Sequence, residues 1–190
     1  MKLLKLQNDA QKRTKCAKTM AKKLACSAVL AGILATNASA IGIGSFKINP
    51  DFGVSLGGNS HKHNVLDNAF LAGGYARLWM GGKGLTIAPM VKYNYIFGKN
   101  GANGFGNLQA GGLIGYSILR LTPYVGGSYS RFDKIGYEDT AAINYGIYFD
   151  IPVVPLSVGL DVSSQNPKIV GSNSRSGWQH QIALTLGLIF

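Results

Sequence analysis

Hydrophobic and polar residues alternate with a period of two along most of the chain after residue 45. In the last segment, residues 179–190, the even positions are almost all apolar, whereas the odd positions are mostly polar or small. A β-strand points successive side chains to opposite faces, so this pattern predicts a strand with one wholly apolar face. Its length suits a strand that crosses a membrane, which needs about 9–11 residues.

The same alternation occurs in seven earlier segments. The eight predicted strands cover residues 46–57, 70–80, 85–97, 107–118, 121–130, 140–150, 156–163 and 179–190. The apolar faces of these segments carry no charge. Polar loops are expected at residues 58–67, 98–104, 133–139 and 165–176, with short turns between the other pairs of strands. An even number of antiparallel strands, joined alternately by long loops and short turns, predicts an all-β, up-and-down transmembrane barrel.

A soluble secreted barrel with its apolar face inside is the main alternative, because the period does not say which face is interior. Three features favour the membrane barrel. Aromatic residues lie near the strand ends: Tyr93, Tyr95, Phe97, Tyr129 and Trp178 toward the long loops, and Phe46, Tyr116, Phe149 and Phe190 toward the turns. Such residues form the two girdles of membrane barrels. The polar faces are also rich in Gly, Ala and Ser, which suits a narrow interior, and their charges nearly balance.

Three prolines lie within the predicted strands and oppose a regular barrel. Pro50, Pro89 and Pro123 each lack the N–H that a strand donates to its neighbour. A closed barrel has no free edge where such a residue is tolerated. All three lie toward the turns, where we expect bulges or a frayed rim.

Six charged residues lie on the polar faces of the strands. They are Lys47, Asp51, Arg77, Lys92, Asp150 and Asp161. Opposite charges in a confined interior are expected to pair. The favoured interpretation is a structural network that fills the lumen, since an eight-stranded barrel is just wide enough for its own side chains. A narrow gated channel is the alternative, because such pairs can rearrange.

The first 40 residues have the features of a secretory signal peptide. Basic residues precede the apolar segment Leu24 to Thr36, and Ala38-Ser39-Ala40 forms a cleavage site. The apolar segment is too short to span a bilayer as a helix. Met20 is an alternative translation start, because the residues after it open a signal of ordinary length. The predicted organisation is a signal peptide at 1–40 and a barrel at 41–190.

Removal of this segment changes the charge and the cysteine content. The whole chain has a net charge of +11, but eight of its 19 Lys and Arg and one of its eight acidic residues precede residue 41. The remaining net charge of +4 does not favour nucleic-acid binding. Cys16 and Cys26 also lie in the signal, so no disulfide is expected in the barrel.

Candidate chemistry is sparse in the rest of the chain. His180 and Ser164 share the apolar phase of neighbouring strands, but no acidic third residue accompanies them, so no catalytic site is predicted. His61 and His63 lie near Asp67 in a predicted loop, which is too few ligands for a metal site. No cofactor is expected, because the sequence contains no nucleotide or phosphate motif.

The signal peptide, the eight alternating strands and the apolar terminal strand together resemble the small outer-membrane barrels of the OmpA, OmpX and opacity-protein type. The resemblance covers residues 41–190 and rests on the pattern alone. It implies export by the general secretory pathway to the outer membrane of a Gram-negative bacterium. It also implies that the last strand is the signal for the barrel-assembly machinery, carried by Leu184, Leu186, Leu188 and Phe190.

The resemblance further implies a monomer that contacts outer-membrane lipid and lipopolysaccharide and extends its long loops outside the cell. The expected function is a structural or adhesion-like role, in which the loops bind host or cell-surface ligands. A channel is one alternative. A lipid A-modifying enzyme is a second alternative, for which His180 and Ser164 are the candidate residues.

Overall fold

The computed structural model describes residues 41–43, 46–61, 69–82, 84–98, 103–133 and 136–190. The strands are β1 (Ile41–Ile43), β2 (Phe46–His61), β3 (Ala69–Gly82), β4 (Leu85–Ile96), β5 (Phe105–Tyr116), β6 (Leu121–Asp133), β7 (Thr140–Asp150), β8 (Leu156–Gln165) and β9 (Gln179–Ile189). The predicted signal peptide, residues 1–40 with Met20, lies outside the described residues.

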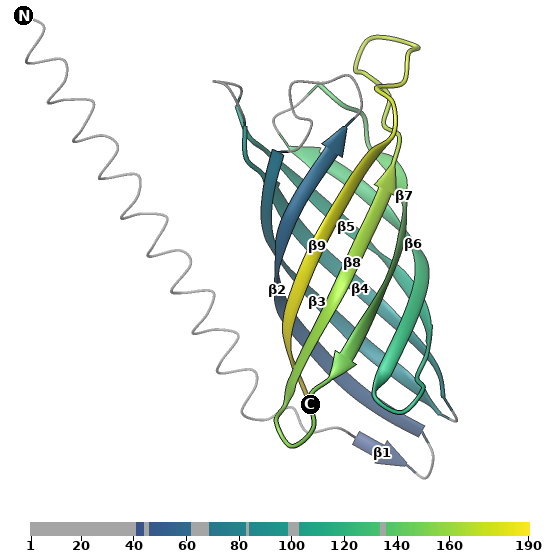
Figure 1. Cartoon of the computed structure of the whole chain (residues 1–190). Coiled ribbons are helices and arrows are strands. Elements are labelled where there is room, and N and C mark those ends of the chain that lie inside the picture. Colours follow the sequence, from purple (N-terminus) through teal and green to yellow (C-terminus); the bar gives the residue numbers. More distant parts are fainter. Residues whose placement is uncertain (1–40, 44–45, 62–68, 83, 99–102, 134–135) are drawn as a thin grey trace, which may run out of the picture. The chain divides into compact units, whose positions relative to one another are not determined.

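Strands β2 to β9 form a closed antiparallel barrel (Figure 1). Each strand pairs with the next one in the chain, and β9 pairs with β2 to close the sheet. The connection 166–178 lies at one end, here the loop end, and the turns after β5 and β7 lie with the C-terminus at the other, the turn end. The predicted eight-stranded up-and-down barrel is therefore confirmed. The short strand β1 was not predicted. It pairs with residues 46–48 of β2, which lie outside the β2–β9 ladder because that ladder ends at Asp51.

The register of the strands determines which side chains share a level of the barrel. A path from partner to partner around the barrel leaves β2 at Asp51 and returns to the same strand at His61, ten residues further on. This stagger requires the strands to tilt by about 35–45° from the barrel axis. Residues that are far apart in the sequence consequently meet inside.

Strands β2 and β6 extend furthest beyond their predicted ends, toward the loop end. β2 continues through His61, so the predicted loop at 58–67 is wrong for its first four residues. β6 continues to Asp133, and its outward positions Arg131 and Asp133 are exposed. Both residues lie beyond residue 130, where this strand was predicted to end, and the outer face of residues 121–130 carries no charge, as predicted. The tilted neighbouring strands still offer backbone partners there, and pairing continues although the side chains are polar.

The three strand prolines cause gaps in pairing but no bulges. Every described ladder keeps one register along its length, so none contains an extra residue. Pro50 lies just beyond Asp51, the last β2 residue that pairs with β9. Pro89 falls in a gap of the β3–β4 ladder, and Pro123 follows the end of the β5–β6 ladder. The frayed rim was predicted correctly, and the bulges were not.

The outer surface of the barrel is apolar. Its exposed side chains include Val54, Leu56, Ile87, Val91, Ile114, Val125, Ile143, Leu160, Ile182, Leu184 and Leu186. Exposed aromatic residues lie at both ends: Phe70, Tyr93, Phe97, Tyr129 and Trp178 near the loops, and Phe46, Tyr116 and Phe149 near the turns. The amide side chains of the strands, and the charged side chains of Asp51, Arg77, Lys92 and Asp161, point inward and are mostly buried. This arrangement is that of a transmembrane barrel, whose apolar band faces lipid.

No helix in the described part of the chain is long and apolar enough to cross a membrane.

Candidate functional site

Four of the six predicted lumen charges meet in one buried cluster, formed by Asp51, Arg77, Lys92 and Asp161 and here called the charged cluster. Asp161 on β8 lies at its centre. Lys92 Nζ donates to Asp161 Oδ2 at 2.7 Å, and Arg77 Nη2 donates to Asp161 Oδ1 at 3.1 Å. The Tyr124 hydroxyl donates to the same Oδ1 at 2.6 Å. Side chains from three strands thus donate hydrogen bonds to one carboxylate.

Arg77 joins Asp161 to the second carboxylate of the charged cluster. Its Nη1 lies 3.9 Å from Asp51 Oδ2, while the Tyr75 hydroxyl donates to Asp51 Oδ1 at 3.2 Å. The guanidinium carbon lies 4.3 Å from the centroid of the Tyr75 ring and 5.0 Å from that of Tyr124. Two cations and two carboxylates leave the cluster neutral, and the rings provide further stabilisation for the buried guanidinium.

Inward glycines make room for this cluster. A Cβ on Gly187 would overlap the Tyr75 hydroxyl, and it would lie 2.5 Å from Asp51 Oδ1. A Cβ on Gly146 would lie 2.5 Å from the Tyr124 hydroxyl. The glycines on the polar faces therefore allow large polar side chains to cross a narrow interior.

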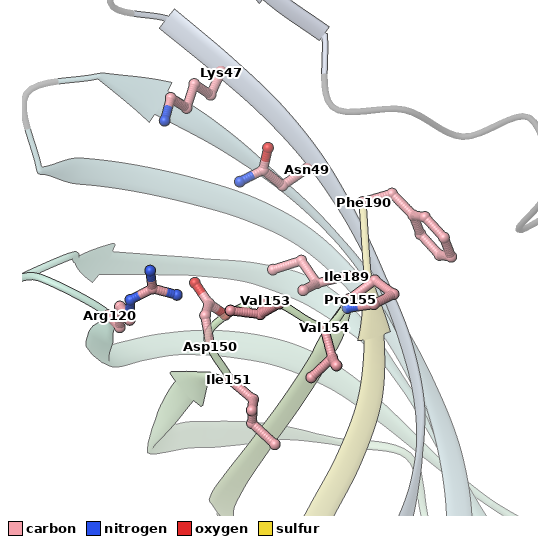
Figure 2. A pocket seen from close by; sticks show the side chains of 10 residues that line it. All are labelled: Lys47, Asn49, Arg120, Asp150, Ile151, Val153, Val154, Pro155, Ile189 and Phe190. Carbon is pink, nitrogen blue, oxygen red and sulfur yellow. The ribbon is translucent and has the colours of Figure 1, made fainter.

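The other two predicted lumen charges lie apart from the cluster. Lys47 and Asp150 line a pocket at the turn end, here called the rim pocket (Figure 2). Its remaining lining residues are Asn49, Arg120, Ile151, Val153, Val154, Pro155, Ile189 and Phe190. Within the described residues, neither Lys47 nor Asp150 forms an ion pair within 4.0 Å. Arg120 was missed from the sequence because it occupies a turn and not a strand face.

A network of neutral amides fills the loop half of the interior. It consists of Asn59, Asn94, Asn107, Gln109, Gln165, Gln179 and Gln181, here called the amide network. Asn107 Oδ1 accepts from Gln109 Nε2 at 2.7 Å and from Gln181 Nε2 at 3.0 Å. This network was not predicted from the sequence. Its signal was present, since the inward positions near the loop end are largely Asn, Gln or Ser.

Aromatic side chains close the loop end of the interior. The rings of Phe105 and Phe132 lie 6.1 Å apart, and Tyr137 from the following loop packs 5.5 Å from Phe132. The His61 ring lies 6.0 Å from Tyr137, and its Nε2 bonds the Ser176 carbonyl at 2.9 Å. His61 is thus inside the barrel mouth and not in a solvated loop. His63 and Asp67 lie outside the described residues.

A second apolar cluster lies in the turn half. The Trp79 ring packs 5.1 Å from Tyr148 and 5.8 Å from Tyr124, and Ala88, Met90 and Leu113 complete the cluster. The polar layers therefore lie between two apolar layers. This arrangement limits the access of water to the charged cluster.

The outward pair Ser164 and His180 forms a hydrogen bond. Ser164 Oγ lies 2.8 Å from His180 Nδ1, and the imidazole stacks on Trp178 with 6.3 Å between ring centroids. A nucleophile and a base are thus within reach, as acyl transfer requires. Among the described residues, no carboxylate forms a hydrogen bond with His180, so the orienting third group of a triad is not present there.

The predicted assembly residues lie on the outer side of the last strand. Leu184, Leu186 and Leu188 point away from the interior, and Leu184 is 70% exposed. Phe190 follows the end of β9, and its ring points away from the rim pocket (Figure 2).

No protein-family model matches the chain, and no curated protein matches it. The barrel is similar to solved barrels of low sequence identity. One, described as a de novo designed transmembrane β-barrel, is 15% identical, with a TM-score of 0.47 over 75% of this chain and 95% of that chain. Another, Neisserial surface protein A, is 10% identical, with a TM-score of 0.45 over 80% of this chain and 100% of that chain.

Proposed function

We propose that the protein is a monomeric integral barrel of the outer membrane of a Gram-negative bacterium, with a structural and surface-interaction role. One observation carries this proposal: a neutral, buried charged cluster lies inside a barrel whose outer face is apolar. Charges are stable in such an interior only when they are paired, and exposed aliphatic side chains are stable only when lipid covers them.

The interior acts as a structural core in this proposal, and not as a pore. Asp161 bonds three side chains, and aromatic layers lie on both sides of the polar layers. Ion flow would require these contacts to break in a medium of low dielectric constant, where unpaired charges are costly. We expect no conductance from the folded protein in planar bilayers, and a steady conductance would contradict this part of the proposal.

The loops carry the surface-interaction role. The connection 166–178 is folded, since Ile169 pairs with Tyr137 and Val170 N donates to the Gly136 carbonyl at 2.9 Å. Ile169, Val170 and Lys168 are exposed on it. A fixed loop that presents apolar and cationic side chains suits a ligand on a host or neighbouring cell. Lipopolysaccharide is the proposed lipid partner at this end.

The last strand has a separate role during assembly. Leu184, Leu186 and Leu188 form an exposed row on the strand that closes the barrel, and Phe190 follows them. We propose that the barrel-assembly machinery recognises this row before β9 pairs with β2.

Two experiments test the proposal. An outer-membrane fraction should contain a form whose gel migration changes on heating, as folded barrels do; a soluble form only would contradict membrane insertion. Replacement of residues 168–175 with a Gly-Ser segment should abolish binding to host cells. Replacement of residues 152–154 at the turn end with a shorter Gly-Ser segment is the control. Unchanged binding after the first exchange would rule out adhesion through this loop.

A lipid A-modifying enzyme is a second candidate function, favoured by the hydrogen bond between Ser164 and His180. The pair lies on the outer face near the loop end, at the level expected for outer-leaflet lipid. His180→Ala should then shift the lipid A mass spectrum, with His61→Ala as the control. An unchanged spectrum would rule this activity out.

A further inference from the structure

Two short turns hold exposed apolar residues in a strained backbone conformation. Leu119 has φ of 60° and Val153 has φ of 75°, and both side chains are fully exposed. Side chains with a Cβ are disfavoured in this region, and β-branched ones most of all. Glycine would relieve the strain at both positions. Strained residues cluster at functional positions, so these two side chains are candidates for contact with a partner at the turn end.

Backbone hydrogen bonds hold both turns beside the rim pocket. Asp150 N donates to the Arg120 carbonyl at 3.0 Å, which joins the turn after β5 to the end of β7. Ile189 N donates to the Pro155 carbonyl at 3.1 Å, which joins the turn after β7 to the end of β9. The exposed apolar residues and the pocket are therefore parts of one surface.

The rim pocket contains polar groups of two kinds. Lys47 and Arg120 provide cations on two of its sides, and both are exposed (Figure 2). Asn49 Oδ1 and Asp150 Oδ1 are buried acceptors that have no hydrogen-bond partner in the described part of the chain. Buried acceptors without donors are unusual in folded proteins. A ligand that satisfies all four groups carries an anion together with N–H donors.

We propose that the turn end binds the headgroup of an aminophospholipid, with its phosphate between Lys47 and Arg120 and its primary ammonium on Asp150 and Asn49. Leu119 and Val153, at the tips of the two turns, then contact the glycerol and the first carbons of the acyl chains of the bound lipid. The pocket volume, about 410 Å³, lies in the range of small-ligand sites. This inference rests on the proposed membrane insertion, because the ligand is a lipid of the leaflet at the turn end.

The ammonium gives the site its selectivity. A primary ammonium has three N–H donors, whereas the quaternary ammonium of a choline headgroup has none. Only the primary amine can donate to the two acceptors, so the choline headgroup loses both hydrogen bonds. At about 1 kcal/mol for each bond, the loss is about 30-fold in affinity.

A titration tests the proposed selectivity. The folded barrel, in a maltoside detergent, is titrated with dihexanoyl-phosphatidylethanolamine, dihexanoyl-phosphatidylcholine and free phosphoethanolamine, while the backbone amide shifts of Arg120 and Asp150 are followed by NMR. We expect the ethanolamine lipid to bind about 30-fold more tightly than the choline lipid. It should also bind more tightly than free phosphoethanolamine, which has no acyl chains to contact Leu119 and Val153. Equal binding of the two lipids would overturn the proposal. Equal binding of free phosphoethanolamine would show a soluble ligand instead of a lipid.

Variants separate this site from the barrel itself. Asp150→Asn should reduce the preference for ethanolamine, because it removes the carboxylate charge that faces the ammonium, and Arg120→Gln should weaken the binding of both lipids. Arg131→Gln, an exposed arginine at the opposite end, is the matched control and should change neither. Heat-dependent gel migration should persist in all three. If the unmodified protein shows no heat-dependent gel migration, membrane insertion is contradicted. If it shows this migration but binds the two lipids equally, only the headgroup site is contradicted.

The strained leucine provides a second, independent readout. Leu119→Gly should relieve strain and raise the unfolding midpoint in detergent that contains no phospholipid. In vesicles rich in phosphatidylethanolamine it should lower the midpoint, because the contact with the acyl chains is lost. A rise in both media would show that this side chain has no lipid partner.

Discussion

The loop half and the turn half of the barrel interior bury different kinds of polar group. The loop half contains the amide network, in which neutral side chains such as Asn107 and Gln181 bond one another. The turn half contains the charged cluster, in which Asp161 binds Lys92 and Arg77. Both halves connect strands across the lumen, and both are almost completely buried.

The difference lies in how much each half depends on a single partner. A neutral amide has two donors and two acceptor lone pairs, so a neighbour can compensate in part for a lost bond. A buried charge has lost its hydration, and only its partner offsets that cost. The turn half should therefore be the more sensitive to substitution, although the loop half has more hydrogen bonds.

The largest effect is expected for Asp161→Asn. This change removes the carboxylate that pairs with both Lys92 and Arg77, so Asp51 is the one carboxylate left in the charged cluster. Removal of one partner of a buried ion pair lowers the free energy of unfolding by about 3–5 kcal/mol. Urea unfolding in lipid vesicles, followed by the fluorescence of Trp79 and Trp178, measures the change in the free energy of unfolding.

A double substitution provides the control for this prediction. Lys92→Met with Asp161→Leu removes a pair and not one member, so it should cost less than Asp161→Asn alone. If the single change costs under about 1 kcal/mol, the charges are hydrated and the cluster is not the interior of a closed barrel.

Leu186→Arg tests whether the polar side chains of both halves face the lumen and the apolar side chains face lipid. Leu186 points outward in mid-strand, and an arginine facing lipid there should cost about 2–4 kcal/mol. Leu121→Arg, at the turn end of the same outer face, is the matched control and should cost about 0–1 kcal/mol near the interface. Folding yield and urea unfolding in vesicles measure both variants. Normal folding of the Leu186 variant would mean that the inner and outer faces are reversed.

Asn107→Leu tests the loop half. The substitution removes the acceptor shared by Gln109 and Gln181, and each donor left unsatisfied costs about 1–3 kcal/mol before its neighbours adjust. Since other amides lie within reach, we expect a total near the lower end of this range. A loss as large as that of Asp161→Asn would remove the distinction between the two halves.

The smallest effects come from a pair of serines. Ser157 Oγ donates to Asp51 Oδ1 in the turn half at 3.3 Å, and Ser55 Oγ donates to Asn94 Oδ1 in the loop half at 2.9 Å. Each change to alanine should cost about 0.5–1.5 kcal/mol, with Ser157→Ala the larger because its acceptor is charged. Thermal unfolding in one detergent compares them directly. The reverse order would show that bond length outweighs charge here.

Much of the fold was predictable from local pattern. Alternation identified all eight barrel strands, and it placed Asp51, Arg77, Lys92 and Asp161 on the polar face. It did not show that Lys47 and Asp150 lie apart from them, because the level of a residue along the barrel depends on the stagger of the strands. The extension of β2 to His61 was missed for a related reason, since pairing with β9 holds a polar segment as strand.

The alternation of residues is enough to predict the period, the number of barrel strands and the apolar and polar sets of residues, because a strand's side chains alternate whatever the rest of the chain does. Which polar residues meet depends on the closed barrel. Arg77 and Asp161 lie on β3 and β8, which are not neighbours in the sheet, and the closed, staggered barrel brings them to the same level across the lumen. The aliphatic row of residues 182–188 likewise became a lipid-facing surface only when β9 paired with β2 and turned its other face inward.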